Sequence, residues 1–216
     1  SKLLSSSKFN KDVILMYGYE SAYKQAWETY EPSSILYTYG KDATVDYMFM
    51  RGETVENDRG QKLYYNVKLT RNSDKSIYDS GIKGTAEQKL SDMKNRLEIL
   101  NSESNAICLS IHQNQFAEPQ YSGAQIFYSA HLMANTELAQ TVQDTFREML
   151  QPENKREIKE CGDSLYLCCN CKNPMVMVEC GFLSNPDEAK LLDTEEYQKK
   201  VAFTVLYSVL SYDLKK

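Results

Sequence analysis

The chain has 216 residues, 42% of them hydrophobic, with only 9 glycines and 5 prolines, and we expect one domain over 1–216 with a flexible N-terminal segment at 1–12. A net charge of -5 argues against a nucleic-acid partner, because phosphate binding requires a basic surface. No run approaches the roughly 18 to 20 apolar residues that a membrane helix needs, so no membrane span is expected.

Regular patterns are sparse in the first part of the chain. Residues 12–17 form a short apolar run that predicts a first buried strand. A helix is expected somewhere within 46–62, and alternating polar and apolar residues predict a second strand at 65–70. Residues 85–101 predict an amphipathic helix. Its apolar face would carry Leu90, Met93, Leu97 and Leu100.

Strands and helices then alternate to the end of the chain. Further strands are expected at 106–111, 125–128, 164–168 and 175–178. Helices are expected from an N-cap at Asn135, from Asn185-Pro186, and through the apolar stripe of Tyr197, Val201, Val205, Val209 and Tyr212. This order predicts an α/β domain with an open, largely parallel twisted sheet of about six strands flanked by helices.

The chain contains six cysteines. Cys108 and Cys180 lie in apolar runs, where a thiol usually acts as a small buried hydrophobe. The other four crowd into positions 161–171, which leaves metal binding, a disulfide or plain packing open. Their spacing matches no paired C-x-x-C metal template.

Two strand ends carry ionisable residues. His112 leaves one predicted strand and Glu179 leaves another, and open α/β sheets place their sites at such ends. A neutral imidazole is a good zinc ligand, and a nearby carboxylate can accept a proton from water. Taken singly, His112 is better explained as a strand-end histidine that bonds to a backbone group, and Glu179 is consistent with a solvated residue at a strand end.

Several short motifs, in a fixed order along the chain, favour a functional role for His112 and Glu179. They lie at 69–71, 73–79, 94–96, 110–114, 121–128 and 179–186. From residue 69 to residue 212 the chain resembles the zinc-dependent N-acetylmuramoyl-L-alanine amidases, especially the spore-cortex amidases of Gram-positive spore formers. The resemblance implies an extracytoplasmic protein of the cell envelope that acts on peptidoglycan and cleaves the amide between the lactyl group of N-acetylmuramic acid and L-alanine.

The resemblance also implies roles for particular residues. His112 matches the second zinc-binding histidine, and Glu179 matches the catalytic glutamate. Part of the substrate groove would be formed by Asn114, Tyr121, Gly123 and Gln125.

The first metal-ligand motif departs from the family pattern. Tyr19 stands where the family has its first zinc-binding histidine, and His131, the only other histidine, is expected at the surface and remote. For the glutamate ligand the candidates are Glu20, Asp46 and Glu53. Zinc is thus the implied cofactor, and its occupancy is in question.

Two hypotheses follow. One is an amidase fold with an impaired zinc site that binds cell-wall glycopeptide or a protein partner. The other is an active amidase with a rearranged metal site. Many of the sixteen tyrosines lie between residues 17 and 65, where they would form either a surface that binds sugars or a protein, or a local core.

Overall fold

A computed structural model of the chain describes residues 10–13, 55–56, 62–66, 68–71, 75–163 and 165–214. The described strands form one sheet in the order β2-β3-β1-β4-β7-β5-β6. They are β1 (Asn10–Val13), β2 (Val55–Glu56), β3 (Lys62–Asn66), β4 (Ala106–Asn114), β5 (Gln125–Tyr128), β6 (Lys159–Glu160) and β7 (Met175–Phe182). Only the β2–β3 and β5–β7 pairs are antiparallel. The prediction of an open, largely parallel sheet is confirmed.

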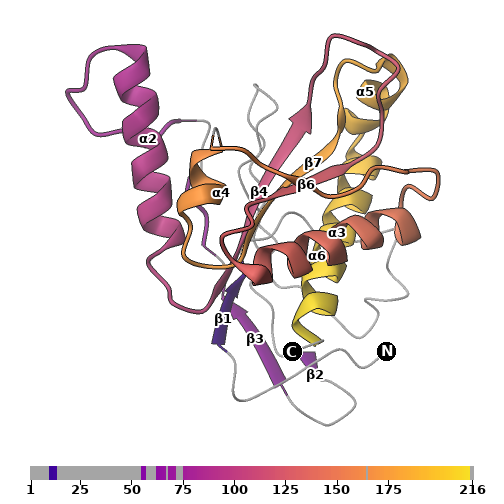
Figure 1. The fold of residues 1–216 in the computed structure, drawn as a ribbon, viewed down its shortest axis with the longest axis horizontal. Helices are drawn as coiled ribbons and strands as arrows, with labels where there is room; N and C mark the ends of the chain where they lie inside the picture. The colour runs from indigo at the N-terminus through magenta and orange to yellow at the C-terminus, as the bar shows by residue number, and fades with distance from the viewer. Residues whose placement is uncertain are drawn as a thin grey trace.

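Helices cover both faces of this sheet (Figure 1). They are α2 (Thr85–Leu100), α3 (Met133–Met149), α4 (Tyr166–Asn170), α5 (Pro186–Leu192) and α6 (Glu195–Leu214). One core joins α3 and α6 to Ile107, Leu109 and Ile111 of β4, and the other joins α2 and α4 to Ala106 and Cys108. This division follows from the alternation of side chains along a strand. None of the described helices combines the length and apolar character needed to cross a membrane.

The C-terminal helices form as predicted. The side chain of Asn185 accepts hydrogen bonds from the backbone N–H groups of Asp187 and Glu188, so it caps α5, and Pro186 occupies the first turn. The stripe on α6 packs into the core against α3, with Val201, Val205, Val209 and Tyr212 buried.

The buried face of α2 differs from the prediction. Leu90 is 51% exposed, while Asp92 and Arg96 form a buried ion pair. Asp92 and Ser91 also accept hydrogen bonds from the backbone N–H groups of Ile77 and Asp79. The outer half of α2 therefore packs through polar contacts with the preceding loop, which a search for apolar periodicity does not detect.

One expected element was wrong, and another is described only in part. Residues 164–168 were expected as a strand, but Tyr166–Asn170 forms α4, because a short apolar run suits a buried helical turn as well as a strand. Of the segment 46–62, where a helix is expected, the described residues Val55–Glu56 pair with the start of β3 as a strand. Residues 46–54 lie outside the described residues, so the helix stays a prediction there.

Boundaries moved in other elements. β1 starts at Asn10, two residues before the predicted strand, and β3 ends at Asn66, whereas the predicted strand ran to Thr70. Asn135 lies inside α3, where its side chain donates to the carbonyl of Ser129 and accepts from the N–H of Met175. It joins the helix to β7 and does not act as a cap.

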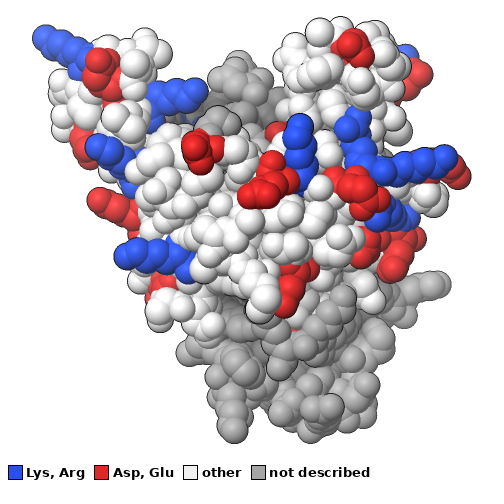
Figure 2. All heavy atoms as spheres, in the orientation of Figure 1, with Lys and Arg blue, Asp and Glu red and all other residues white. Residues whose placement is uncertain are grey.

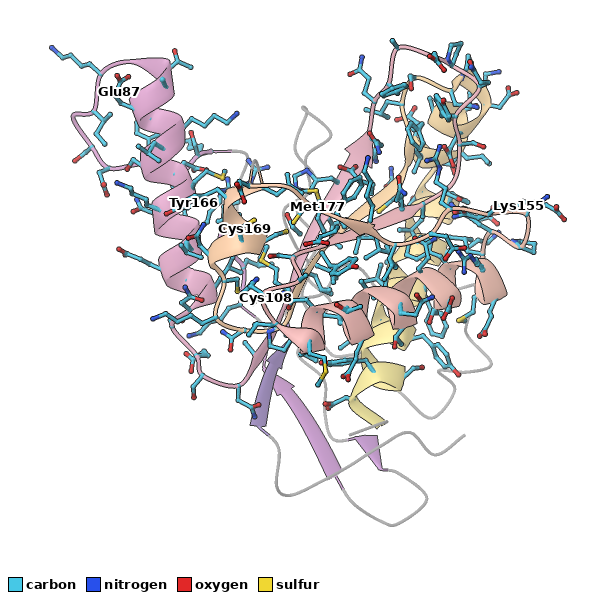
Figure 3. All side chains as sticks on the ribbon, in the orientation of Figure 1. Glu87, Cys108, Lys155, Tyr166, Cys169 and Met177 are labelled. Carbon is cyan, nitrogen blue, oxygen red and sulfur yellow. The ribbon has the colours of Figure 1, made fainter. Side chains whose placement is uncertain are left out.

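All six cysteines are free thiols, and five lie in or against the core beneath α4. Figure 3 shows Cys108, Cys169 and Met177 gathered between α4 and the sheet. Cys180 packs in the opposite core. Of the three roles that the sequence left open, the structure supports packing.

Candidate active site

Three polar side chains from neighbouring strands form a row on the sheet face that carries α2 and α4. His112 of β4 pairs directly with Glu179 of β7, and Glu179 pairs in turn with Gln125 of β5. Residues paired across a sheet project from the same face, with Cβ atoms about 5 Å apart. The strands thus bring together an imidazole, a carboxyl group and a carboxamide.

The row lies near the carboxyl ends of β4 and β7, between α2 and α5 (Figure 1). Figure 2 shows the lobe formed by α2 and the lobe that contains α5 standing apart at this edge of the molecule. Open α/β sheets bind ligands outside the carboxyl ends of their strands. This edge is therefore the candidate active site.

His112 belongs to β4 itself, which continues to Asn114. Its Nε2 lies 2.8 Å from Oγ of Ser110, which is buried two residues earlier on the same face. Which atom donates depends on the tautomer of the ring. Because both residues belong to one strand, this contact helps to fix the orientation of the imidazole.

One carboxyl oxygen of Glu179, Oε2, is buried and has no hydrogen-bond partner among the described residues. Burial disfavours the charged form and raises the pKa of Glu179 to about 7. A carboxyl group with a pKa near neutrality can both accept and donate a proton at physiological pH. Groups of this kind concentrate at functional sites.

A β-bulge follows Glu179. His112 pairs with Glu179 and Asn114 pairs with Phe182, so three steps along β7 match two along β4. The extra residue interrupts the alternation of side chains, and Glu179 and Phe182 consequently share one face of the sheet. Cys180, between them, packs in the opposite core.

Arg156 and the rings of Phe182 and Tyr121 border the row on the β5 side and are called its wall below. The guanidinium carbon of Arg156 lies 4.4 Å from the ring centre of Phe182 and 5.4 Å from that of Tyr121. Its Nε donates to the carbonyl of Ser122 at 2.7 Å, and its Nη1 donates to Oε1 of Gln125 at 3.3 Å. Arg156 is therefore joined to the row through Gln125.

Glu188 of α5 ties the loop before β5 to the end of β7. Its Oε1 accepts from the N–H of Gly123 at 2.8 Å, and its Oε2 accepts from the N–H of Phe182 at 2.6 Å. Burial raises the pKa of Glu188, although both hydrogen bonds favour the charged form. Gly123 has a φ of 89°, which residues with a side chain rarely adopt.

Metal ligands are few at this site. Among the described residues, no three His, Cys, Asp or Glu side chains are grouped to hold an ion. The chain has two histidines, and His131 follows β5 at the opposite end of β7 from Glu179, where its ring nitrogens contact Ser129 and Cys171. The site therefore has a single imidazole, and the described residues do not complete a three-ligand zinc site.

The residues expected in the groove lie together. Asn114, Tyr121, Gly123 and Gln125 border the row or its wall. The candidate ligand positions Tyr19, Glu20, Asp46 and Glu53 lie outside the described residues, and their roles stay predictions.

A family model described as N-acetylmuramoyl-L-alanine amidase matches residues 54–211. The chain belongs to the N-acetylmuramoyl-L-alanine amidase family. It is 35% identical over 150 residues to the germination-specific N-acetylmuramoyl-L-alanine amidase of Bacillus subtilis, an alignment that covers 69% of this chain and 62% of that protein. The chain thus spans less than two thirds of the length of this amidase.

Solved amidase structures share the fold. The CwlD amidase from Clostridioides difficile, solved in complex with the GerS lipoprotein, superposes with a TM-score of 0.67 at 35% identity, covering 70% of this chain and 77% of that one. Another N-acetylmuramoyl-L-alanine amidase, from Clostridium difficile 630, gives a TM-score of 0.59 at 26% identity, covering 71% and 75%. Among the amidases, the chain is similar to those of the germination and spore-cortex kind, and the family is zinc-dependent.

Sequence reasoning missed two residues of this candidate site. Arg156 lies in the charged segment 152–160, which reads as a solvated loop, and no local pattern distinguishes it from Lys155. Glu188 lies in the first turn of α5, where the helix dipole alone accounts for an acidic residue, but its side chain bridges two backbone N–H groups. Both roles depend on contacts between distant segments.

Proposed function

We propose that this chain is an extracytoplasmic amidase-fold domain that binds cell-wall glycopeptide and whose zinc site is incomplete. The observation that carries the proposal is the single imidazole at the site, since His131 lies at the other end of β7. Catalytic zinc usually takes three protein ligands. Tyr19 is a poor substitute for a histidine, because a phenol has a reference pKa of about 10 and stays protonated near neutral pH.

The groove retains features that suit glycopeptide binding. Phe116 is 53% exposed and Tyr121 is 38% exposed, and their rings meet edge to face at 5.2 Å. Exposed aromatic rings can pack against the apolar face of a sugar. The polar row and Arg156 lie alongside these rings and offer hydrogen bonds to a peptide.

An active amidase is the second candidate, and the unpartnered oxygen of Glu179 favours it. In this candidate His112 would supply one ligand to zinc, which would polarise the lactyl carbonyl when bound. Glu179 would accept a proton from the attacking water and return it to the nitrogen that leaves with L-alanine. The remaining ligands would come from Glu20, Asp46 or Glu53.

Metal content and hydrolysis, measured on one preparation, separate the candidates. We expect less than one zinc per chain after dialysis, no release of stem peptides that begin with L-alanine, and retention of the protein on insoluble peptidoglycan. A full equivalent of zinc that is lost in His112→Ala, together with peptide release, would establish the active amidase and overturn the first proposal.

We further propose a protein partner from the cell envelope. The CwlD amidase relative was solved in complex with a lipoprotein, GerS. In this chain the tyrosine-rich region between residues 17 and 65 is the expected contact surface. Cross-linking of the full chain with a photoreactive group placed in that region, followed by identification of the captured lipoprotein, would test the assignment.

A further inference from the structure

The guanidinium of Arg156 is fixed beside the row of His112, Glu179 and Gln125 by contacts on several sides. It stacks on Phe182 and lies within reach of Tyr121, its Nε donates to Ser122, and its Nη1 donates to Gln125. A planar group held in this way loses little further conformational entropy when it binds a ligand.

The charge of Arg156 lacks a carboxylate partner of its own. The hydrogen bonds of its guanidinium to described residues come from Nε and Nη1, and none of its nitrogens forms a salt bridge with a described residue. It interacts electrostatically with Glu188, whose two oxygens already accept from Gly123 and Phe182. A half-buried guanidinium with an unused N–H edge is a natural site for an anion.

We propose that Arg156 binds a carboxylate of the stem peptide, namely the free α-carboxylate of the γ-linked D-glutamate that follows L-alanine. This inference rests on the proposed function, since it takes peptidoglycan as the ligand. It makes Arg156 a specificity residue, which discriminates an acidic stem peptide from one in which this carboxylate is amidated.

The geometry agrees with the chemistry of that ligand. Gln125, which accepts from Arg156, is the direct pairing partner of Glu179. Arg156 therefore lies about one to two strand spacings from Glu179, each spacing being about 4.8 Å. Two residues of extended peptide span at most about 7 Å. A ligand whose L-alanine amide sits at Glu179 can thus present the next carboxylate to Arg156.

The test compares two ligands that differ only at the α-carboxyl group of the second residue, which is a carboxylate in one and a neutral carboxamide in the other. N-acetylmuramoyl-L-alanyl-D-glutamate and its amidated form, with D-isoglutamine, are titrated into the full chain by calorimetry or NMR. We expect the acid to bind roughly tenfold or more tightly than the amide, since charge-assisted hydrogen bonds are about twice as strong as neutral ones. Arg156→Gln should weaken binding of the acid and bring the ratio close to one.

Two variants control this experiment. Lys155→Gln removes the same charge from the adjacent residue, whose exposed side chain points outward at the edge of the molecule (Figure 3), and it should keep the preference. Arg156→Lys keeps the charge but loses the planar fork, and it should keep part of the preference. Thermal unfolding of each variant confirms that it is folded.

The outcomes separate this inference from the proposed function. A folded Arg156→Gln protein that still prefers the acid as strongly as the wild type would overturn the inference. Binding of both ligands without preference by the wild type would overturn it as well, while leaving glycopeptide binding intact. If neither ligand binds and peptidoglycan does not retain the chain, the proposed function fails and the inference fails with it.

Discussion

A Cβ atom on Gly181 would lie 2.7 Å from Cδ of Glu188, so the two residues occupy complementary space at the end of β7. Only a glycine at this position lets the carboxylate of α5 reach the backbone of Phe182 and Gly123. The conformations of the Gly123 loop and of the bulged end of β7 therefore depend on the absence of a side chain at position 181.

Replacement of Gly181 tests this dependence. Gly181→Ala should lower the free energy of unfolding by roughly 1–3 kcal/mol, because the added methyl forces Glu188 to move within a packed site. Urea unfolding measures the change. Gly162→Ala is the matched control, since a Cβ there meets no atom within 4 Å, and it should be close to neutral. Equal effects in the two variants would contradict the packing argument.

The charge of Glu188 can be removed with little change of shape. In Glu188→Gln the side-chain N–H₂ must face one of the two backbone N–H donors, so one hydrogen bond is lost at a cost of about 1–3 kcal/mol. Asp187→Asn, which changes an exposed neighbour, should be nearly neutral. Chemical denaturation of both variants measures the difference, and an unaffected Glu188→Gln protein would show that the bridge contributes little.

The raised pKa of Glu179 predicts that the stability of the metal-free protein depends on pH. Its folded pKa of about 7 lies above the ordinary value of 4.5. Because the folded protein holds the proton of Glu179 more tightly than the unfolded chain does, Glu179 contributes stability that is fully present below about pH 4.5. This contribution is lost as the pH rises through about 7. Glu179→Gln should therefore become more stable relative to the wild type as the pH rises from 5 to 8. Parallel unfolding curves for the two proteins over this range would refute the raised pKa.

We expect replacement of Tyr19 by histidine to raise the affinity of the chain for zinc. If Tyr19 occupies the position of the first family histidine, Tyr19→His adds a second imidazole to the site of His112, and zinc affinity should rise strongly. Calorimetric titration with zinc measures the gain, which should vanish in the double variant Tyr19→His/His112→Ala. Tyr23→His serves as a control for a histidine elsewhere in the same segment. Unchanged affinity in Tyr19→His would show that the correspondence of residues 13–21 with the family motif is wrong.

The parts of the fold that the sequence predicts well have strong local signals. Asn185 and Pro186 mark the start of α5, and long apolar runs mark β4 and β7. Parallel pairing of two such runs is enough to bring His112 and Glu179 together. Where the apolar run is only about five residues long, as at 164–168, the same sequence suits a strand or a helical turn, and the prediction was wrong.

The remaining site residues depend on contacts that no local pattern contains. Phe182 reaches the face of Glu179 only because β7 bulges between them. Arg156 becomes part of the site only because its loop folds back over Phe182 and Gln125. A bulge of one residue changes which face every later side chain occupies, and strand periodicity alone does not reveal it.

Burial of the thiols beneath α4 makes them resistant to oxidation. Burial raises the pKa of Cys161 to about 11 and raises that of Cys168 further, so both side chains stay protonated as unreactive thiols at pH 7. Cys171 accepts a hydrogen bond from Cys108, which lowers its pKa, but it is only 1% exposed and an oxidant cannot reach it. Of the six cysteines, Cys169 is the partly exposed one and the thiol that an oxidant can reach, while the five buried cysteines can stay unpaired in oxidising surroundings.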